Sequence, residues 1–389
     1  MQLTENLSNR TDATYTPAKS FSQSIRETHK QIKSLLDANP DLVNPFNKIR
    51  KLARNLRTAA VYDITSKCNL WCEGCYYFEG DQHPLKEETV LEKWEAFFAS
   101  ERQRGVTYGY FAGAEPSLFQ DRLLAACQYI PSGVVAHNGT IKIDPAIPYR
   151  ITVSVWGDEV TTKRLRGGNV FWKAIRNYEG DSRALFAYTI TNKNIDKIRA
   201  VAEICQDHDI ELSFNMFSPT ISYLQKLRSS QKNDKEFFRI SSPKDNLCYT
   251  PQELEYCRIT VAKLIDEFPE TIVYPHPYNN EITAEGSIFT LDDNDGLATN
   301  CAGRHNGTHR TYLSTLELSD RKCCTPNVSC RECRQLTTYL PSRLQPTGKD
   351  VRHRESFIDW LEICEYWAWF YLGKQHKPVI RQQMHEITS

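Results

Sequence analysis

The sequence predicts an α/β fold that is built around a parallel sheet. Between residues 58 and 216, six short runs rich in β-branched and aromatic residues alternate with longer stretches of helical periodicity. Strands that alternate with helices in this way form βαβ units, and their crossovers are right-handed. In such folds the chemistry collects on loops at the carboxyl ends of the strands. We therefore expect the functional residues to gather at one edge of the sheet.

The predicted strands and helices follow one another with short connections. Strands are expected at residues 61–64, 107–111, 133–136, 150–155, 185–190 and 211–215. The helices that connect them or lie between them are expected at residues 87–104, 117–129, 171–178 and 195–208. From about residue 217 onward this alternation stops.

Helical sequence flanks the alternating segment on both sides. Residues 20–57 have a helical pattern that is interrupted near Pro40 and Pro45, whereas residues 1–16 are expected to be disordered. A later helix is expected at residues 251–268, where proline suits the first helical position. A final helix at residues 355–372 carries an aromatic stripe, which is expected to cap a core.

Composition restricts the class of protein. The chain has 389 residues, of which 40% are hydrophobic and 25% charged, as is typical of soluble globular proteins. Its formal net charge of zero gives no global field toward nucleic acid or an acidic membrane. No apolar run is long enough to span a membrane, and the N-terminus lacks the apolar segment of a secretory signal. We therefore expect a cytoplasmic protein without a nucleic-acid partner.

Thirteen cysteines are many for a chain without an export signal. Thiols do not persist as disulfides in a reducing compartment, so metal binding or catalysis is the better interpretation. Eight of them form two groups, which are Cys68, Cys72 and Cys75, and Cys301, Cys323, Cys324, Cys330 and Cys333. The other five lie in apolar or helical patterns and are expected to be small core residues: Cys127, Cys205, Cys248, Cys257 and Cys364.

The first group follows directly on the first predicted strand. Its C-x3-C-x2-C spacing puts three thiolates on one loop, where they can hold three irons of a four-iron cluster. Because such clusters normally take four cysteines, the fourth iron would be open to another ligand. From this loop alone, a zinc site completed by His83 or a distant residue is an alternative. Three unconnected buried thiols are another.

Further motifs lie at the ends of the later strands. They are GAEP at residues 113–116, HNGT at residues 137–140 and SVWG at residues 154–157. Small residues let the backbone approach a ligand closely. Each motif also has an ordinary structural explanation, because Ser117 can cap a helix and an Asn-Gly pair is a common turn. Arg166 follows, and a guanidinium suits bidentate binding of a carboxylate, although it could also be a surface arginine.

In this order, the cysteine loop and the strand-end motifs resemble the radical SAM superfamily over residues 58–216. The resemblance implies a partial (β/α)6 TIM-like barrel in which Cys68, Cys72 and Cys75 hold a [4Fe-4S] cluster with an open site. S-adenosylmethionine (SAM) would bind at that site. The residues that the resemblance and the strand ends assign to SAM are Tyr76, Gly113, Ala114, Glu115, Asn138, Ser154, Arg166 and Thr189.

Three positions depart from the pattern of this superfamily. Ala114 stands in place of a second glycine, and Trp156 in place of an aspartate. The residue before the third cysteine is usually aromatic, but here it is Gly74, so the packing on the adenine side is expected to differ.

The resemblance also implies a chemistry. The reduced cluster would cleave SAM to methionine and a 5′-deoxyadenosyl radical, which removes a hydrogen atom from the substrate. The electron would come from a flavodoxin or ferredoxin. We expect a small-molecule substrate from a specialised or cofactor pathway that undergoes oxidation, epimerisation, rearrangement or bond formation. No residue is assigned as catalytic acid or base, although residue type and position make His137, Asp158, Tyr76 and Tyr188 conceivable.

The second cysteine group offers four thiolates from two spaced segments, which fits either a structural zinc or a fully ligated cluster. After a barrel of this kind it resembles the auxiliary-cluster domains called SPASM and twitch, which implies one auxiliary [4Fe-4S] cluster. Its ligands would be Cys301, Cys330, Cys333 and either Cys323 or Cys324. The spacing does not decide between the last two.

The expected organisation has five parts. They are an N-terminal helical extension (residues 1–57), the barrel (58–216), a segment that completes and connects it (217–300), the auxiliary-cluster region (301–340) and a C-terminal helix and tail (341–389).

Two other functions stay open on the sequence. The first is a peptide maturase that modifies a ribosomally made precursor. Such enzymes commonly begin with a winged-helix-like domain, whereas the segment before this barrel has a helical pattern without a β-rich part. The second is a non-catalytic iron–sulfur or zinc protein, for instance a redox sensor.

Overall fold

The structure is a computed structural model that describes residues 18–55, 58–78, 86–229, 240–305, 310–319, 323 and 328–381. For residues 18–25, 55 and 305 it describes the backbone only. The expected disorder of residues 1–16 and the alternative zinc ligand His83 lie outside the described residues.

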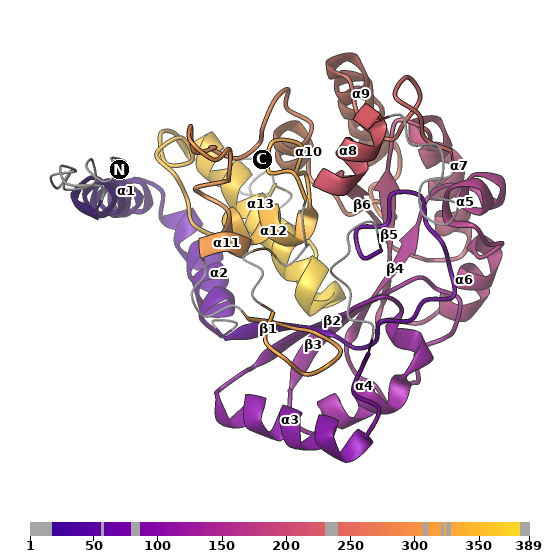
Figure 1. Ribbon diagram of the computed structural model, residues 1–389. Helices are drawn as coiled ribbons and strands as arrows, with labels where there is room; N and C mark the ends of the chain where they lie inside the picture. Colours follow the sequence, from indigo (N-terminus) through magenta and orange to yellow (C-terminus); the bar gives the residue numbers. More distant parts are fainter. Residues whose placement is uncertain are drawn as a thin grey trace, which may run out of the picture.

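A parallel sheet of seven strands in the order β6-β5-β4-β3-β2-β1-β7 forms the centre of the molecule (Figure 1). The strands are β1 (Ala59–Asp63), β2 (Tyr108–Ala112), β3 (Ser132–His137), β4 (Arg150–Val155), β5 (Ala184–Ile190), β6 (Leu212–Met216) and β7 (Arg310–Tyr312). The sheet curves but does not close between β6 and β7, so the predicted α/β fold with a partial barrel is confirmed. All six predicted strands are present, and β7 is an addition that pairs with β1.

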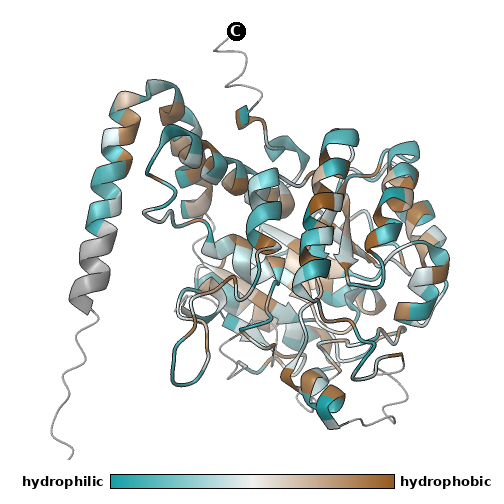
Figure 2. Cartoon of the chain, turned by 90° about the horizontal axis from the view of Figure 1, so that it is seen from above, coloured by the Kyte–Doolittle hydropathy of each residue, from teal (hydrophilic) through white to brown (hydrophobic). Residues whose placement is uncertain are grey.

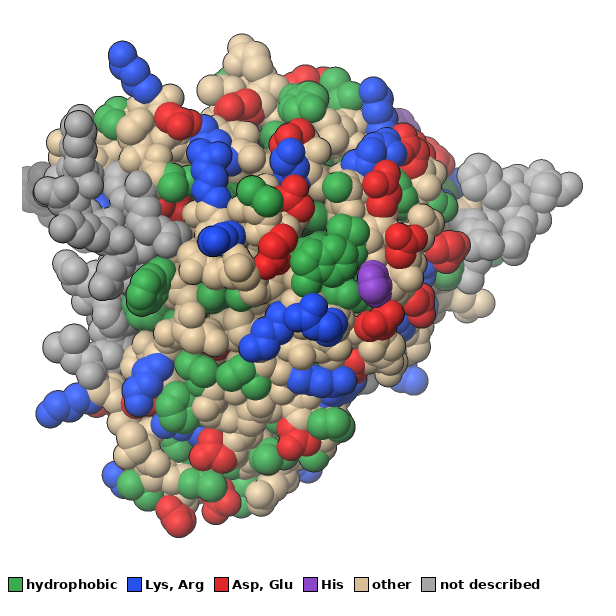
Figure 3. All heavy atoms as spheres, turned by 90° about the vertical axis from the view of Figure 1, so that its right-hand side faces the viewer, with side chains coloured by type: hydrophobic (Ala, Val, Ile, Leu, Met, Phe, Trp, Pro, Cys, Tyr) green, Lys and Arg blue, Asp and Glu red, His purple; other side chains and the backbone are tan. Residues whose placement is uncertain are grey.

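Helices cover the outer face of this sheet (Figure 1). Four of them were predicted: α3 (Leu91–Gln103), α4 (Gln120–Cys127), α6 (Phe171–Tyr178) and α7 (Ile198–Asp207). Short 3-10 turns, Pro116–Leu118 and Ile195–Lys197, lead into α4 and α7. On the face that α5, α6 and α7 help to form, acidic and basic side chains are interspersed (Figure 3).

One helix on this face, α5 (Glu159–Arg166), was not predicted. Its sequence EVTTKRLR is too short and too polar to show an apolar period. It begins where Asp158 accepts a hydrogen bond from the backbone of Thr161, and it ends at Gly167, which adopts a left-handed conformation with φ of 78°.

The N-terminal extension is helical, as expected. It consists of α1 (Ala18–Ala38), a 3-10 turn (Pro40–Leu42) and α2 (Val43–Asn55). The chain is interrupted at Pro40 as predicted, but Pro45 lies in the first turn of α2, where proline is tolerated. In Figure 2, α1 projects away from the body of the molecule.

The other helices follow the barrel. They are α8 (Ile221–Ser229), α9 (Pro251–Glu267), α10 (His276–Ile282), α11 (Ala302–His305), α12 (Leu336–Ser342) and α13 (Arg354–Leu372). Of these, α9 and α13 were predicted. Across the described ranges, no helix combines the length and the apolar character that crossing a membrane requires.

The aromatic helix α13 joins the N-terminal extension to the barrel. Near its start, Phe357 packs on Phe46 of α2 with a ring separation of 5.8 Å. Near its end, the hydroxyl of Tyr366 lies 2.8 Å from Ser213 Oγ of β6, and the carbonyl of Tyr371 accepts a hydrogen bond from Tyr108 of β2 at 2.8 Å. The aromatic stripe therefore caps the core at the amino ends of the strands, as expected.

Side chains alternate between two environments along each barrel strand. In β4, Ile151 and Val153 are fully buried in the apolar core, whereas Thr152 and Ser154 line the barrel interior. In β4 the interior face is therefore the more polar of the two, and it leads to the strand end.

Glu101 of α3 holds the seventh strand to the barrel. Its carboxylate is buried and accepts hydrogen bonds of 2.8 Å from Tyr62 of β1 and from Tyr312 of β7. Burial alone would raise the pKa of Glu101, but hydrogen bonds from Arg104 and the two tyrosines outweigh it and lower the pKa. We expect Glu101→Gln to reduce the free energy of unfolding at pH 7 by about 2 kcal/mol.

This stabilisation depends on pH in a definite direction. Because the pKa of Glu101 is lower in the folded state, its contribution is present above the unfolded pKa and is lost as pH falls through the folded value. In urea titrations, the difference in free energy of unfolding between wild type and Glu101→Gln should therefore become smaller when the pH is well below about 4. An equal difference at pH 7 and at such low pH would contradict this assignment.

Candidate active site

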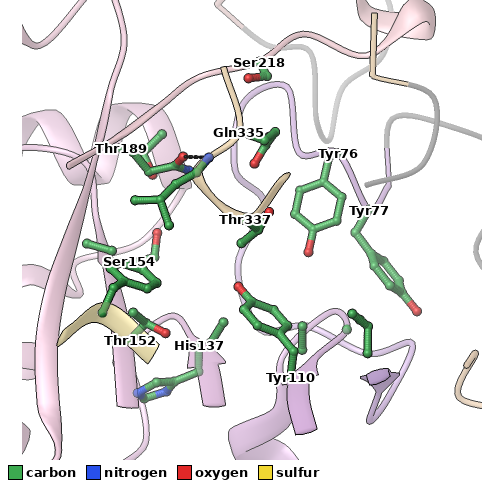
Figure 4. Close-up of a pocket in the computed structure, with 18 of the residues that line it drawn as sticks. Tyr76, Tyr77, Tyr110, His137, Thr152, Ser154, Thr189, Ser218, Gln335 and Thr337 are labelled. Atoms are coloured by element: carbon green, nitrogen blue, oxygen red, sulfur yellow. Dashed lines mark hydrogen bonds between the residues drawn. The ribbon is translucent and has the colours of Figure 1, made fainter. Parts of the chain in front are cut away.

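A cavity of about 820 Å³ opens at the carboxyl ends of the strands and continues into the barrel interior. Its lining comes from β1 to β6, from the loop after β1 and from α2, α12 and α13. In Figure 4, Ser154 and Thr189 lie on one side of this cavity and Tyr76 on the other. The volume is in the range of pockets that enclose a cofactor or a small ligand.

The three cysteines of the first group all line this cavity. The loop that carries them turns tightly, because the backbone N–H of Cys75 donates to the carbonyl of Cys72 at 3.2 Å. Gly74 between them has φ of 61°, and a Cβ there would lie 2.9 Å from the ring of Phe217. The positive φ and the ring of Phe217 therefore both disfavour an aromatic residue at position 74.

The three thiols lie close enough to influence one another. Burial raises the pKa of Cys68 to about 11, and the neighbouring Cys72 adds to this rise. Burial likewise raises the pKa of Cys75 to about 12, again with a contribution from Cys72. A metal that binds here must displace protons.

The arrangement of the donor groups bears on the two kinds of metal site that the sequence suggests, a zinc ion and a four-iron cluster. In the ranges that the structure describes, no three His, Cys, Asp or Glu side chains converge closely enough to hold one metal ion. The thiols of a four-iron cluster bind separate irons around a common core. Three thiols that share one cavity wall fit that arrangement.

The GAEP turn presents its backbone to the cavity. Gly113 has φ of 112°, and a Cβ there would lie 2.8 Å from the carbonyl oxygen of Thr65. The N–H of Ala114 donates to the same oxygen at 2.9 Å. The turn therefore requires glycine at position 113 but tolerates the methyl group of Ala114.

Glu115 lines the cavity, but its carboxylate is engaged by neighbouring groups. The backbone N–H of Ser117 donates to Oε1 at 3.0 Å, and that of Asn138 donates to Oε2 at 2.8 Å. Burial alone would raise the pKa of Glu115, yet hydrogen bonds from His137 and Ser117 outweigh it and lower the pKa. Glu115, rather than Ser117, caps the following turn, so the capping role that the sequence suggested for Ser117 was wrong.

Asn138 also lines the cavity while it supports the cysteine loop. Its amide Nδ2 donates to Asn69 Oδ1 at 2.7 Å, and its Oδ1 accepts from the backbone N–H of Thr140 at 2.9 Å. Asn69 donates in turn to Thr140 Oγ1 at 2.9 Å. Asn69 was not predicted from the sequence, although a polar residue directly after the first cysteine was a signal for such a supporting contact.

The remaining predicted cofactor residues, Ser154, Arg166 and Thr189, line the cavity as well. Trp156, which stands where the superfamily has an aspartate, also contributes to its wall and donates from Nε1 to Ser154 Oγ at 3.3 Å. Arg166 is buried at the end of α5, and its Nε donates to Cys72 Sγ at 3.4 Å. All eight residues that the sequence assigned to SAM thus border one space.

The conceivable acid–base residues divide into two pairs. His137 and Tyr76 line the cavity. Asp158 instead caps α5, and the buried hydroxyl of Tyr188 donates to the carbonyl of Asn194 at 2.7 Å, outside the cavity lining. The structure therefore gives no support to an acid–base role for Asp158 or Tyr188.

Four cysteines of the second group lie close together. Burial raises the pKa of Cys301 to about 11, and the neighbouring thiols of Cys323 and Cys330 add to this rise. Burial raises the pKa of Cys333 to about 12, with contributions from Cys323 and Cys301. Cys324 lies outside the described residues.

The second cysteine group adjoins the main cavity through the start of α12. After Cys333, the N–H of Arg334 donates to Ser218 Oγ at 2.8 Å, and the N–H of Leu336 donates to Asn215 Oδ1 of β6 at 3.2 Å. These bonds fix the segment on the carboxyl end of β6. As a result, Gln335 and Thr337 line the cavity (Figure 4).

The cavity floor was not anticipated from the sequence. Trp367, Phe370 and Tyr371 of α13 line it together with Tyr110 of β2. The hydroxyl groups of Tyr110 and Tyr76 point into the cavity (Figure 4). The aromatic stripe of α13 therefore contributes to the cavity as well as to the core.

Replacing Gly113 tests the GAEP turn. In Gly113→Ala, the new Cβ would meet the Thr65 carbonyl in a positive-φ conformation, so the turn must shift. We expect SAM affinity, measured by anaerobic calorimetry on cluster-loaded protein, to fall by about tenfold or more, or about 1.4 kcal/mol. Gly180→Ala is the matched control, because Gly180 also has a positive φ but an added Cβ would meet nothing within 4 Å. Equal affinities in the two variants would contradict the assignment.

No family model matches the chain. The sporulation killing factor maturation protein SkfB of Bacillus subtilis (strain 168) is 25% identical over an alignment of 198 residues, and the match covers 45% of this chain and 48% of that protein. The chain therefore spans about half the length of the curated relative it matches.

Solved structures with a similar arrangement were also found. SuiB of Streptococcus suis bound to S-adenosylmethionine has a TM-score of 0.47 and 15% identity, over 77% of this chain and 71% of that one. Native anSMEcpe with bound AdoMet has a TM-score of 0.46 and 14% identity, over 77% of this chain and 81% of that one.

Proposed function

We propose that this chain, a radical SAM protein by its cysteine loop, its strand-end motifs and its fold, cleaves SAM reductively and abstracts a hydrogen atom from a substrate. The observation that carries this proposal is the convergence of Cys68, Cys72, Cys75 and all eight expected SAM residues on one cavity. The partial barrel, with its cavity at the carboxyl ends of the strands, supports it further.

The residues that line the cavity would have different roles in this reaction. Cys68, Cys72 and Cys75 would hold a [4Fe-4S] cluster, which supplies the electron that cleaves SAM to methionine and a 5′-deoxyadenosyl radical. The backbone of the Gly113 turn and the guanidinium of Arg166 suit the amino and carboxylate groups of SAM. The remaining groups orient the substrate and exclude water from the reactive space.

The second cysteine group would hold an auxiliary cluster. Cys301, Cys323, Cys330 and Cys333 provide four thiols, which is a complete ligand set for a [4Fe-4S] cluster. A cluster with four protein ligands does not bind substrate directly, so it would tune or relay electrons. The external electron donor would be a flavodoxin or ferredoxin.

For the substrate, we propose a polypeptide that the enzyme modifies after its synthesis. The relative is named for the maturation of a sporulation killing factor, which favours a maturation reaction over the small-molecule substrate expected from the sequence. Gln335 and Thr337 line the cavity and provide uncharged polar groups that suit peptide amides. The described part of the N-terminal extension is helical, so recognition would rest on the cavity and its rim.

Electron paramagnetic resonance (EPR) tests SAM binding at the loop cluster. In reconstituted, dithionite-reduced protein, SAM should change the shape of the cluster signal, because it would bind the open iron. The same addition should change nothing in Cys72→Ala protein. A reduced spectrum that SAM leaves unchanged in wild-type protein would contradict the proposal.

The substrate proposal needs a separate test. Short peptides encoded beside the gene would be synthesised and incubated with loaded, reduced protein and SAM. A peptide substrate should increase 5′-deoxyadenosine formation and change its own mass. If no such peptide responds and a small molecule is turned over instead, the polypeptide proposal fails while the radical SAM proposal stands.

A further inference from the structure

The last turn of α5 supports the cysteine loop through the backbone. The N–H of Trp71 donates to the carbonyl of Arg166 at 3.2 Å, and the N–H of Glu73 donates to the carbonyl of Leu165 at 2.7 Å. Carbonyls at a helix end lack partners within the helix, so these bonds satisfy both elements at once. The loop and the end of α5 therefore form one hydrogen-bonded unit.

The side chain of Arg166 extends from this unit toward the loop thiols. Only 3% of the residue is exposed to solvent. Its Nε–H donates to Cys72 Sγ at 3.4 Å, and one terminal N–H donates to the carbonyl oxygen of Ser154. The second of these bonds fixes the guanidinium on β4, so its contact with the sulfur depends on both α5 and β4.

We propose that Arg166 tunes the reduction potential of the cluster held by the first cysteine group, through its hydrogen bond to the Cys72 sulfur. This role rests on the proposed function and is distinct from the binding of the SAM carboxylate, because it involves a protein thiolate and exists before SAM binds. Reduction potentials of clusters depend on hydrogen bonds to their sulfurs, on net charge and on solvent exposure. Arg166 combines a donor and a positive charge in a buried position.

The direction of the effect follows from charge. The reduced cluster carries one more negative charge than the oxidised cluster, and part of this charge resides on the thiolate sulfurs. A buried guanidinium that donates to one sulfur stabilises the reduced form more than the oxidised form. Arg166 therefore raises the reduction potential, and its loss makes the cluster harder to reduce.

The chain offers a matched control on the same helix. Arg164 lies two residues earlier in α5 and is exposed to solvent, outside the cavity lining. Arg164→Gln removes the same charge from the same helix without removing the bond to the sulfur. Arg166→Gln removes charge and bond together, whereas Arg166→Lys keeps a charge but cannot reproduce the Nε–H donor.

The experiment is an anaerobic redox titration of reconstituted protein without SAM, followed by EPR. The signal that is absent from Cys72→Ala protein belongs to the loop cluster. We expect the midpoint of Arg166→Gln to be more negative than those of wild type and Arg164→Gln, with Arg166→Lys in between. Iron content is measured for every variant.

The outcomes separate this inference from the proposed function. If Arg166→Gln and Arg164→Gln have the same midpoint, the tuning role is wrong while the proposed function stands. If both Arg166 variants fail to hold the cluster that Arg164→Gln holds, Arg166 serves assembly instead, and the tuning role is likewise overturned. If wild-type protein holds no four-iron cluster at the loop, the proposed function itself fails.

Discussion

Replacing Cys72 by alanine is expected to abolish SAM cleavage and to remove one four-iron cluster from the protein. Cys72 lines the cavity between Cys68 and Cys75 and accepts the hydrogen bond from Arg166, so no other described thiol can take its place on the loop. We expect 5′-deoxyadenosine formation to fall by about a thousandfold or more, because the electron has no route to SAM. Liquid chromatography of the acid-quenched reaction measures this product.

Cys127→Ala is the control for this experiment. Cys127 is also a half-buried free thiol, but it lies at the end of α4 and outside the cavity lining. This variant should keep both its iron and its activity. Comparable 5′-deoxyadenosine formation by Cys72→Ala and wild type would show that the loop does not hold the reactive cluster.

Replacing Cys333 by alanine is expected to remove the second metal centre. Cys333 is buried beside the thiols of Cys301 and Cys323, and it begins the segment that carries Gln335 and Thr337 into the cavity wall. Iron content should fall from about eight to about four per chain, because each centre would hold four irons. Iron and sulfide analysis together with Mössbauer spectroscopy measures the change.

This variant should separate the two stages of the reaction. SAM cleavage with dithionite should persist, because the ligands of the first cluster are intact. Substrate turnover should fall sharply, because the auxiliary cluster that would tune or relay electrons is lost. Cys248→Ala, a half-buried thiol that lines neither the cavity nor the second cysteine group, should change neither quantity. Zinc in place of iron at the second group would contradict the prediction.

The strands could be predicted because their signal is local. Each is a short apolar run between turn residues, and the residues at its end carried the motifs that pointed to a cofactor. The three-residue strand β7 has no such signal, since it is held by Tyr312 and its contact with Glu101 of α3. Likewise α5 is polar and short, and its end is fixed by the cysteine loop.

The parts of the site that were missed depend on contacts between distant segments. Tyr371 reaches the cavity floor because its carbonyl binds Tyr108, which lies more than two hundred residues earlier. Gln335 reaches the wall because the segment after Cys333 is tied to the end of β6. Neither contact leaves a pattern in the sequence, so only the folded chain places these residues.

The structure gives the physical surroundings of Gly74 and Trp156, two positions that depart from the radical SAM pattern. Gly74 replaces an aromatic residue because its backbone has a positive φ and the ring of Phe217 fills the space beside it. Trp156 replaces an aspartate at the end of β4 and still binds Ser154 Oγ. The rings of Trp156 and Phe217, which come from outside the cysteine loop, line the cavity together with Tyr76 and Tyr77 of that loop.

Product analysis of cluster-loaded protein shows whether the loop cluster cleaves SAM. Protein reconstituted anaerobically with iron and sulfide is reduced with dithionite and incubated with SAM, and the products are quantified over time. Reductive cleavage by the loop cluster predicts 5′-deoxyadenosine and methionine in equal amounts, with neither formed by Cys72→Ala protein. If fully loaded wild-type protein forms no 5′-deoxyadenosine, or forms no more than the Cys72→Ala variant, the chain is not a radical SAM enzyme.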